Sequence, residues 1–85
     1  MKNLIKFNYQ TTVNRGLIKP TTTINQFILK LEEEVQEFID ASLNNNGDEK
    51  EELSDIILVC LNIAEHYNID IEKELIKKVL KNSKR

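Results

Sequence analysis

Apolar residues recur at helical spacing in the segment that follows Pro20. A spacing of three and four residues places such side chains on one face of a helix. Pro20 and the threonines at 21–23 are typical of a helix start, and the run of asparagines before Gly47 is typical of a helix end. The pattern therefore predicts a helix over about residues 21–43. Its apolar face consists of Ile24, Phe27, Ile28, Leu31, Val35, Phe38 and Ile39.

A second helix is predicted over about residues 48–67. Asp48, followed by Glu51, resembles a capping box at its start. Between Ile56 and Ala64 the apolar residues surround almost the whole helix axis. A helix that is apolar on every side must be buried on every side, which so small a chain can hardly provide alone. We therefore expect self-association into a homodimer or a homotetramer.

Two further helices complete the predicted architecture. The segment 68–70 interrupts the pattern, and Asp70 can cap a third helix over about residues 70–84. A short N-terminal helix over about 4–14, followed by a turn at Gly16, is also consistent with the sequence. We thus expect a single all-α domain over residues 1–85, an antiparallel helical bundle completed by oligomerisation. Residues 1–19 carry the weakest pattern.

The composition narrows the chemistry further. The chain has 85 residues, 40% of them hydrophobic, with one cysteine and one histidine. A single Cys60 excludes an internal disulfide framework and a cysteine-rich zinc site, and a single His66 argues against a histidine-based metal site. Within the apolar run we interpret Cys60 as a small core residue. We interpret His66 as a surface residue or a helix-dipole contact.

The sequence shows neither a membrane segment nor an export signal. The first residues lack the apolar run of a signal peptide, and the apolar stretch over 56–61 is far too short to span a bilayer. Together with the free cysteine, these features predict a cytoplasmic location.

Charge is strongly segregated along the chain, although the net charge is only −2. Residues 32–55 contain most of the 14 acidic side chains and one basic residue, Lys50, whereas both ends are basic. Nucleic acid is not an expected partner, because the basic ends are short and the acidic middle would repel phosphates. The repulsion within the acidic segment must be offset by the basic ends, by bound cations or by both.

Four carboxylates are predicted to lie at the same height along the first two long helices. Glu34 and Glu37 flank the apolar face of one helix, and Glu52 and Asp55 share a face of the next. The short turn makes these helices antiparallel neighbours, which pairs Glu34 with Asp55 and Glu37 with Glu52. Oxygen ligands without histidine or cysteine suit Mg²⁺ or Mn²⁺. The alternative is an acidic surface that is only solvated.

Two polar features lie outside this cluster. Lys78, Asn82 and Arg85 share one side of the C-terminal helix and could bind phosphates, unless they form only a solvated helix end. Asn62, a polar residue in the apolar run, is predicted two turns beyond Asp55 on the same side. It would line a pocket or make a hydrogen bond across a subunit interface.

With these motifs assembled, the chain resembles the MazG-like nucleoside triphosphate pyrophosphohydrolases of the all-α NTP pyrophosphatase superfamily. The family pattern E-E-x-x-E followed by E-x-x-D is similar to residues 33–37 and 52–55. The stretch at 63–71 is similar to the family's "iA…GID", with Asn68 where glycine is usual. The ending at 78–85 is similar to K-x-x-K-N-x-x-R. The resemblance covers roughly residues 20–85.

The resemblance implies hydrolysis of a nucleoside triphosphate between its α- and β-phosphates, giving a monophosphate and pyrophosphate. It also implies a Mg²⁺ cofactor, with Mn²⁺ as a substitute, and oligomers with sites near subunit interfaces. Glu33, beside Glu34, would orient or deprotonate water, so both are candidate catalytic residues. Lys30 precedes the first motif, as lysine often does in the family, and is a candidate pocket residue together with Asn62. The implied metal ligands are Glu34, Glu37, Glu52 and Asp55, and the implied phosphate-binding residues are Lys78, Asn82 and Arg85.

Two alternatives remain open at this point. Within the superfamily, the chain could be a phosphoribosyl-ATP pyrophosphohydrolase. From another class, it could be a non-enzymatic helical interaction module whose carboxylates are only a solvated surface.

Overall fold

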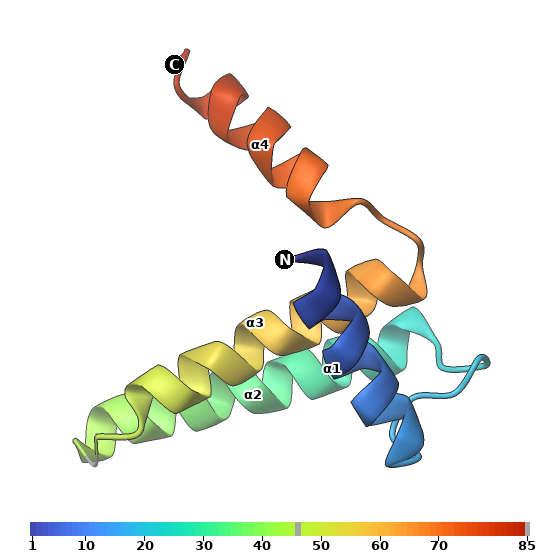
Figure 1. The fold of residues 1–85 in the computed structure, drawn as a ribbon. Helices are drawn as coiled ribbons and strands as arrows, with labels where there is room; N and C mark the ends of the chain where they lie inside the picture. The colour runs from blue at the N-terminus through green and yellow to red at the C-terminus, as the bar shows by residue number, and fades with distance from the viewer. Residues whose placement is uncertain (46, 85) are drawn as a thin grey trace.

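The computed structural model describes residues 1–45 and 47–84. These residues form four helices and contain no strand, which confirms the predicted all-α class. The predicted bounds differ from the observed ones by at most a few residues, as helix ends usually do. The helices are α1 (Lys2–Asn14), α2 (Ile24–Asn44), α3 (Glu49–His66) and α4 (Ile71–Asn82) (Figure 1).

The start and end of α2 follow from its capping residues. Thr23 is the N-cap, and its side chain accepts a hydrogen bond from the backbone N–H of Gln26, whose side chain completes a capping box. Asn45, the C-cap, has φ 52° and lies in the left-handed region, which asparagine tolerates better than most residues. The helix begins at Ile24 rather than at residue 21 because the last threonine is the cap. Asn46 lies outside the described residues.

The caps of α3 and α4 differ from each other. The carboxylate of Asp70 accepts a hydrogen bond from the backbone N–H of Lys73 and caps α4, as predicted. Asp48 is the N-cap residue of α3, but its side chain makes no capping hydrogen bond, so the predicted capping box with Glu51 is wrong. Acidic residues in the first turn still favour this helix end, because they face the positive end of the helix dipole.

The core lies where α2 and α3 form an antiparallel hairpin and α1 crosses α3 (Figure 1). Phe27, predicted as a core residue, is only 4% exposed, whereas Phe38 is half-buried. Ile18 comes from the segment between α1 and α2 and is also 4% exposed, so this segment closes one end of the core. The other buried apolar residues are Ile5, Ala41, Val59, Leu61 and Ala64.

Polar side chains fasten α1 to α3. The amide nitrogen of Asn8 donates a hydrogen bond of 2.9 Å to Oδ1 of Asn62, and Nζ of Lys6 lies 3.2 Å from Oε1 of Glu65. Because Asn62 is buried, its hydrogen bond is shielded from competing water. These contacts fix the N-terminal helix, whose sequence pattern was weak, on the hairpin.

His66 joins α1, α3 and the segment before α2. Its Nδ1 lies 2.7 Å from the hydroxyl of Tyr9, and its Nε2 lies 3.0 Å from the carbonyl oxygen of Thr22. A carbonyl only accepts, so Nε2 carries a hydrogen, and in the neutral imidazole Nδ1 then accepts from the hydroxyl of Tyr9. The ring of Phe27 packs edge-on against the imidazole at 5.0 Å. His66 is thus half-buried and structural rather than a surface residue, and it lies in the last turn of α3, where the prediction of a helix-dipole contact placed it.

One side of α3 is uncovered in the single chain. Leu53 and Ile57 are 47% and 50% exposed, and Cys60 is exposed on the same helical face. The expectation that Cys60 is a core residue is wrong for this chain, because α1 and α2 cover the other sides of the helix only. An apolar stripe at spacing i, i+4 and i+7 therefore faces outward.

The C-terminal helix α4 extends away from the other three (Figure 1). It has no buried residue. Its apolar face is exposed, with Leu75 at 48%, Ile76 at 58% and Val79 at 65%. Within the described part of the chain, none of the helices has both the length and the apolar character needed to cross a bilayer.

Candidate active site

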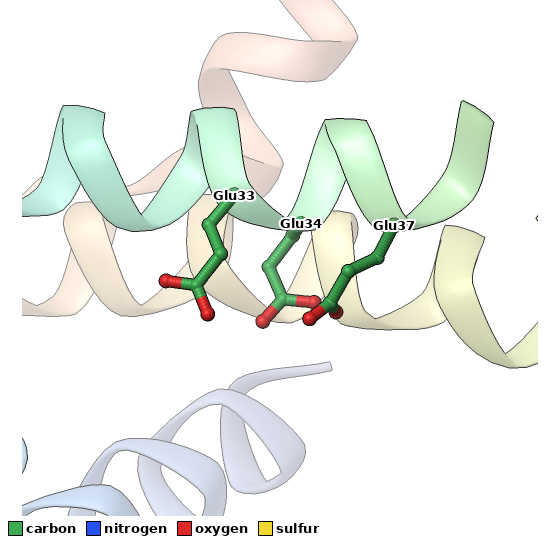
Figure 2. A group of neighbouring side chains, drawn as sticks. All are labelled: Glu33, Glu34 and Glu37. Carbon is green, nitrogen blue, oxygen red and sulfur yellow. The ribbon is translucent and has the colours of Figure 1, made fainter. Parts of the chain in front are cut away.

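Carboxylates from both helices of the hairpin meet around Glu34. One group joins this residue to Glu33 and Glu37 on α2, and a second joins it to Glu52 and Asp55 on α3. In each group, one carboxylate oxygen from every residue lies within 4.8 Å of the others. Figure 2 shows the three α2 side chains extending to the same side of their helix, with the carboxylates of Glu34 and Glu37 adjacent.

The helical arrangement explains most of this cluster. Residues three apart on a helix are neighbours, and the antiparallel hairpin brings the α3 pair level with the α2 pair. Glu33 lies four residues before Glu37, so the helix places the two side chains next to each other. It is exposed, and one of its oxygens joins the group.

Glu34 is the buried centre of the cluster. Its residue exposure is 7%, and its Oε1 lies 3.0 Å from Nζ of Lys30. Its second oxygen, Oε2, and Oε2 of Glu52 are buried without a hydrogen-bond partner in the described residues. An unsatisfied buried carboxylate oxygen is costly. A bound cation, or a proton shared with a neighbouring carboxylate, would satisfy these oxygens.

The crowding of negative charge changes the acidity of the cluster. A hydrogen bond to Glu34 and the nearby charges raise the pKa of Glu37. Burial, followed by the charges of Asp55 and Glu34, raises the pKa of Glu52. The hydrogen bond and ion pair with Glu34 raise the pKa of Lys30, against a smaller opposing effect of its partial burial. Glu37, Glu52 and Lys30 therefore each hold their proton more tightly than the same side chain would in isolation.

These features fit a hard divalent cation. In the described residues, both groups contain carboxylates alone, the oxygen donors that Mg²⁺ and Mn²⁺ prefer. A cation would satisfy the two unpartnered oxygens and offset the repulsion that raises the pKa values. Glu34, Glu37, Glu52 and Asp55 are thus arranged as a set that could hold such an ion.

The phosphate-binding candidates are not brought to this cluster in one chain. Lys78 and Asn82 are exposed on α4, which leads away from the hairpin (Figure 1). Arg85 lies outside the described residues. A role for these residues at the carboxylates therefore requires another copy of the chain or another position of α4.

The two pocket candidates do share a cavity. Lys30 and Asn62 line a space of about 230 Å³ beside the cluster. Sequence reasoning did not identify the residues that close it from the N-terminal side, Thr12, Leu17 and Ile18. Leu17 and Ile18 are adjacent apolar residues after Gly16, but two adjacent residues do not show the spacing from which a helix face can be predicted.

Comparison with known protein families decides the assignment. The family model of the MazG nucleotide pyrophosphohydrolase domain matches residues 22–85. This chain belongs to the MazG family. It is a nucleotide pyrophosphohydrolase, and its acidic groups are typical of MazG metal sites. Searches of curated proteins and of solved structures gave no significant match. The residues of α1 and of the following segment up to Thr21 lie outside the MazG match.

Proposed function

We propose that this MazG protein is a Mg²⁺-dependent nucleoside triphosphate pyrophosphohydrolase that cleaves between the α- and β-phosphates. The products would be a nucleoside monophosphate and pyrophosphate. The observation that carries the proposal is the pair of buried, unpartnered carboxylate oxygens on Glu34 and Glu52, within a cluster built from two helices. A solvated acidic surface would leave these oxygens in water.

The side chains of the cluster have separable roles in this reaction. Glu34, Glu37, Glu52 and Asp55 would hold Mg²⁺, with Mn²⁺ as a substitute. When bound, the cation supplies charge neutralisation at the phosphates and lowers the pKa of coordinated water. Each ligand oxygen must be deprotonated to bind.

Glu33 is the carboxylate suited to proton transfer. It is exposed, yet it belongs to the same group as Glu34 and Glu37. An exposed carboxylate can orient a water molecule and accept its proton as the oxygen attacks phosphorus. The P–O bond to the pyrophosphate then breaks, and the negative charge leaves with that group. Lys30, beside Glu33 and Glu34, places a positive charge next to the reacting phosphates.

Phosphate binding by α4 is proposed to occur between copies of the chain. Lys78 and Asn82 are exposed on a helix that leads away from its own carboxylates. The same helix carries an exposed apolar face, and α3 carries the stripe of Leu53, Ile57 and Cys60. A homodimer or homotetramer would cover both apolar surfaces and could place the cationic face of α4, with Arg85, at a neighbouring cluster.

The direct test is a substrate panel. Purified protein is incubated with each canonical NTP and dNTP, and with phosphoribosyl-ATP, in Mg²⁺ or Mn²⁺, and the products are separated. Monophosphate and pyrophosphate support the proposal, whereas orthophosphate release or no turnover of any nucleotide contradicts it. Selective turnover of phosphoribosyl-ATP would instead favour that member of the superfamily.

A matched variant separates catalysis from folding. Glu37→Gln removes one proposed ligand at an exposed position and should abolish activity while the helical content persists. Glu32→Gln changes a carboxylate on the same helix that belongs to neither group, so it should keep full activity. Equal activity of the two variants would remove Glu37 from the site.

A further inference from the structure

The cavity beside the carboxylate cluster is lined by apolar side chains and by several polar ones. It measures about 230 Å³ and is lined by Leu17, Ile18, Phe27 and Val59, and by the polar residues Lys30 and Asn62 among others. Pockets for drug-sized ligands measure roughly 300–1,000 Å³. This cavity therefore suits a single ring system rather than a whole nucleotide.

Its position links it to the cluster. Nζ of Lys30, on the cavity wall, lies 3.0 Å from Oε1 of Glu34. Along α3, Val59 and Asn62 follow Asp55 at spacing i+4 and i+7, on the same side of the helix. Seven residues of helix span about 10 Å. The sugar of one nucleotide can bridge such a distance between a phosphate at the cluster and a ring in the cavity.

Hydrogen bonds determine which atom of Asn62 remains available for a ligand. The hydroxyl of Thr12 donates to the carbonyl oxygen of Asn8 at 2.8 Å, so Thr12 Oγ1 can only accept. The amide nitrogen of Asn62, 3.4 Å from this oxygen, donates to it, while Oδ1 of Asn62 accepts from Asn8 at 2.9 Å. One N–H of Asn62, a residue that is 7% exposed, has no partner in the described part of the chain.

We propose that this cavity binds the nucleobase of the substrate, and that Asn62 favours bases whose carbonyl oxygen can accept its free N–H. The inference rests on the proposed nucleotide hydrolysis and deepens it. Two groups of the wall, the free N–H of Asn62 and the ammonium group of Lys30, are donors, and they match a base with a carbonyl oxygen better than adenine, which has none. Leu17 and Ile18, which contribute to the apolar wall of the cavity, precede the residues that the MazG model matches.

The first test is binding without catalysis. UMP and AMP, which have no bond between α- and β-phosphates to cleave, are titrated into the ¹⁵N-labelled protein in Mg²⁺, and the side-chain amide of Asn62 is followed by NMR. We expect UMP to shift this signal and to bind more tightly than AMP by about tenfold, the effect of one hydrogen bond. Equal affinities, or no change at Asn62 while UMP binds elsewhere, would overturn the proposal.

A filled cavity gives the second test. Leu17→Trp places a bulky indole ring at a residue that lines the cavity. Leu17 is 58% exposed, so the fold should tolerate the larger side chain. Leu4→Trp is the matched control, because Leu4 is 57% exposed on α1 and lines no cavity described here. UMP binding should be lost in the first variant and kept in the second. Unchanged UMP binding in Leu17→Trp would contradict the proposal.

The third test changes the preference itself. Asn62→Asp replaces the free N–H by an oxygen and should lower the ratio of kcat/KM for UTP over that for ATP by about tenfold. Asn8→Ala breaks the same network outside the cavity, so it should lower stability but keep the ratio. An unchanged ratio in an active Asn62→Asp enzyme would refute the base pocket and leave the pyrophosphohydrolase proposal standing. A chain that binds UMP as expected but hydrolyses no nucleotide would refute the pyrophosphohydrolase proposal and leave the base pocket standing.

Discussion

Nζ of Lys30 and Oε1 of Glu34 lie 3.0 Å apart, one helical turn from each other on α2. Glu34 is the residue shared by both carboxylate groups, and Lys30 also lines the adjacent cavity. The pair therefore stands between the charge cluster and the space proposed for the base. The positive charge of Lys30 reduces the repulsion among the carboxylates. A bound cation should reduce the same repulsion, so the stabilising effects of the two should overlap.

Loss of Lys30 should destabilise the protein mainly when no metal is bound. Lys30→Met removes the ion pairs with Glu33 and Glu34, which should lower the free energy of unfolding by about 0.5–1 kcal/mol in EDTA. Urea denaturation with and without Mg²⁺ measures the difference. Saturating Mg²⁺ should shrink the gap between variant and wild type, and an undiminished gap would show that lysine and cation act independently.

The raised pKa of Glu37 predicts a specific pH dependence. A carboxyl whose pKa is higher in the folded state holds its proton more tightly there than in the unfolded chain. The free energy of unfolding therefore falls as the pH rises from the ordinary glutamate pKa through the higher pKa of the folded state. Below the ordinary glutamate pKa, Glu37 is protonated in both states and this loss is absent. Glu37→Gln cannot ionise, so in EDTA its melting temperature should rise relative to wild type between pH 4 and pH 8.

The control is the same comparison of melting temperatures between wild type and Glu37→Gln, made in Mg²⁺ instead of EDTA. Saturating cation should remove the relative gain of Glu37→Gln, because the ionised wild-type carboxylate then has a partner. A relative loss of stability of Glu37→Gln with increasing pH in EDTA would show that the pKa of Glu37 is lowered instead of raised.

Metal binding should depend on the two carboxylates with unpartnered oxygens. Glu34→Gln or Glu52→Gln should each weaken Mn²⁺ binding by at least about tenfold, measured by isothermal titration calorimetry. Glu32→Gln is the control with the same chemical change on the same helix. Binding of Mn²⁺ that is equally strong in all three variants would mean that the cation is held elsewhere on the acidic surface.

The sequence predicted the helices and the carboxylate cluster because both depend on local periodicity. The i, i+3 spacing of Glu34 and Glu37, and of Glu52 and Asp55, together with one short turn, suffices to bring these side chains together. Glu33 joins the cluster by the same periodicity, because it lies four residues before Glu37.

The N-terminal contribution was not predictable in the same way. Asn8 and Thr12 meet Asn62 only because α1 crosses α3, and that crossing depends on contacts between residues far apart in the sequence. Likewise, the exposure of Cys60 depends on which sides of α3 its neighbours cover, not on the apolar run itself. The spacing of residues within one helix therefore predicts neither the contacts of α1 with Asn62 nor the exposure of Cys60.

Self-association should depend on the exposed stripe of α3. Ile57 is 50% exposed at the centre of this stripe, and Ile57→Lys would bury a charge in any interface formed there. We expect the wild type to sediment as a dimer or tetramer at micromolar concentration and Ile57→Lys as a monomer. Leu43→Lys, at a 79% exposed position near the end of α2, should sediment as the wild type does. A monomeric wild type would contradict the proposed oligomer.

The N-terminal helix should owe much of its stability to His66. His66→Phe keeps a ring beside Phe27 but removes both hydrogen bonds, leaving the hydroxyl of Tyr9 and the carbonyl of Thr22 without their partner. The expected loss is about 1–3 kcal/mol in urea denaturation followed by circular dichroism. Tyr9→Phe removes one of the two bonds and should cost about 0.5–1.5 kcal/mol. In the double variant, Tyr9→Phe should add less than this, because the partner of its hydroxyl is already gone, and strictly additive costs would show that the two side chains stabilise the fold separately.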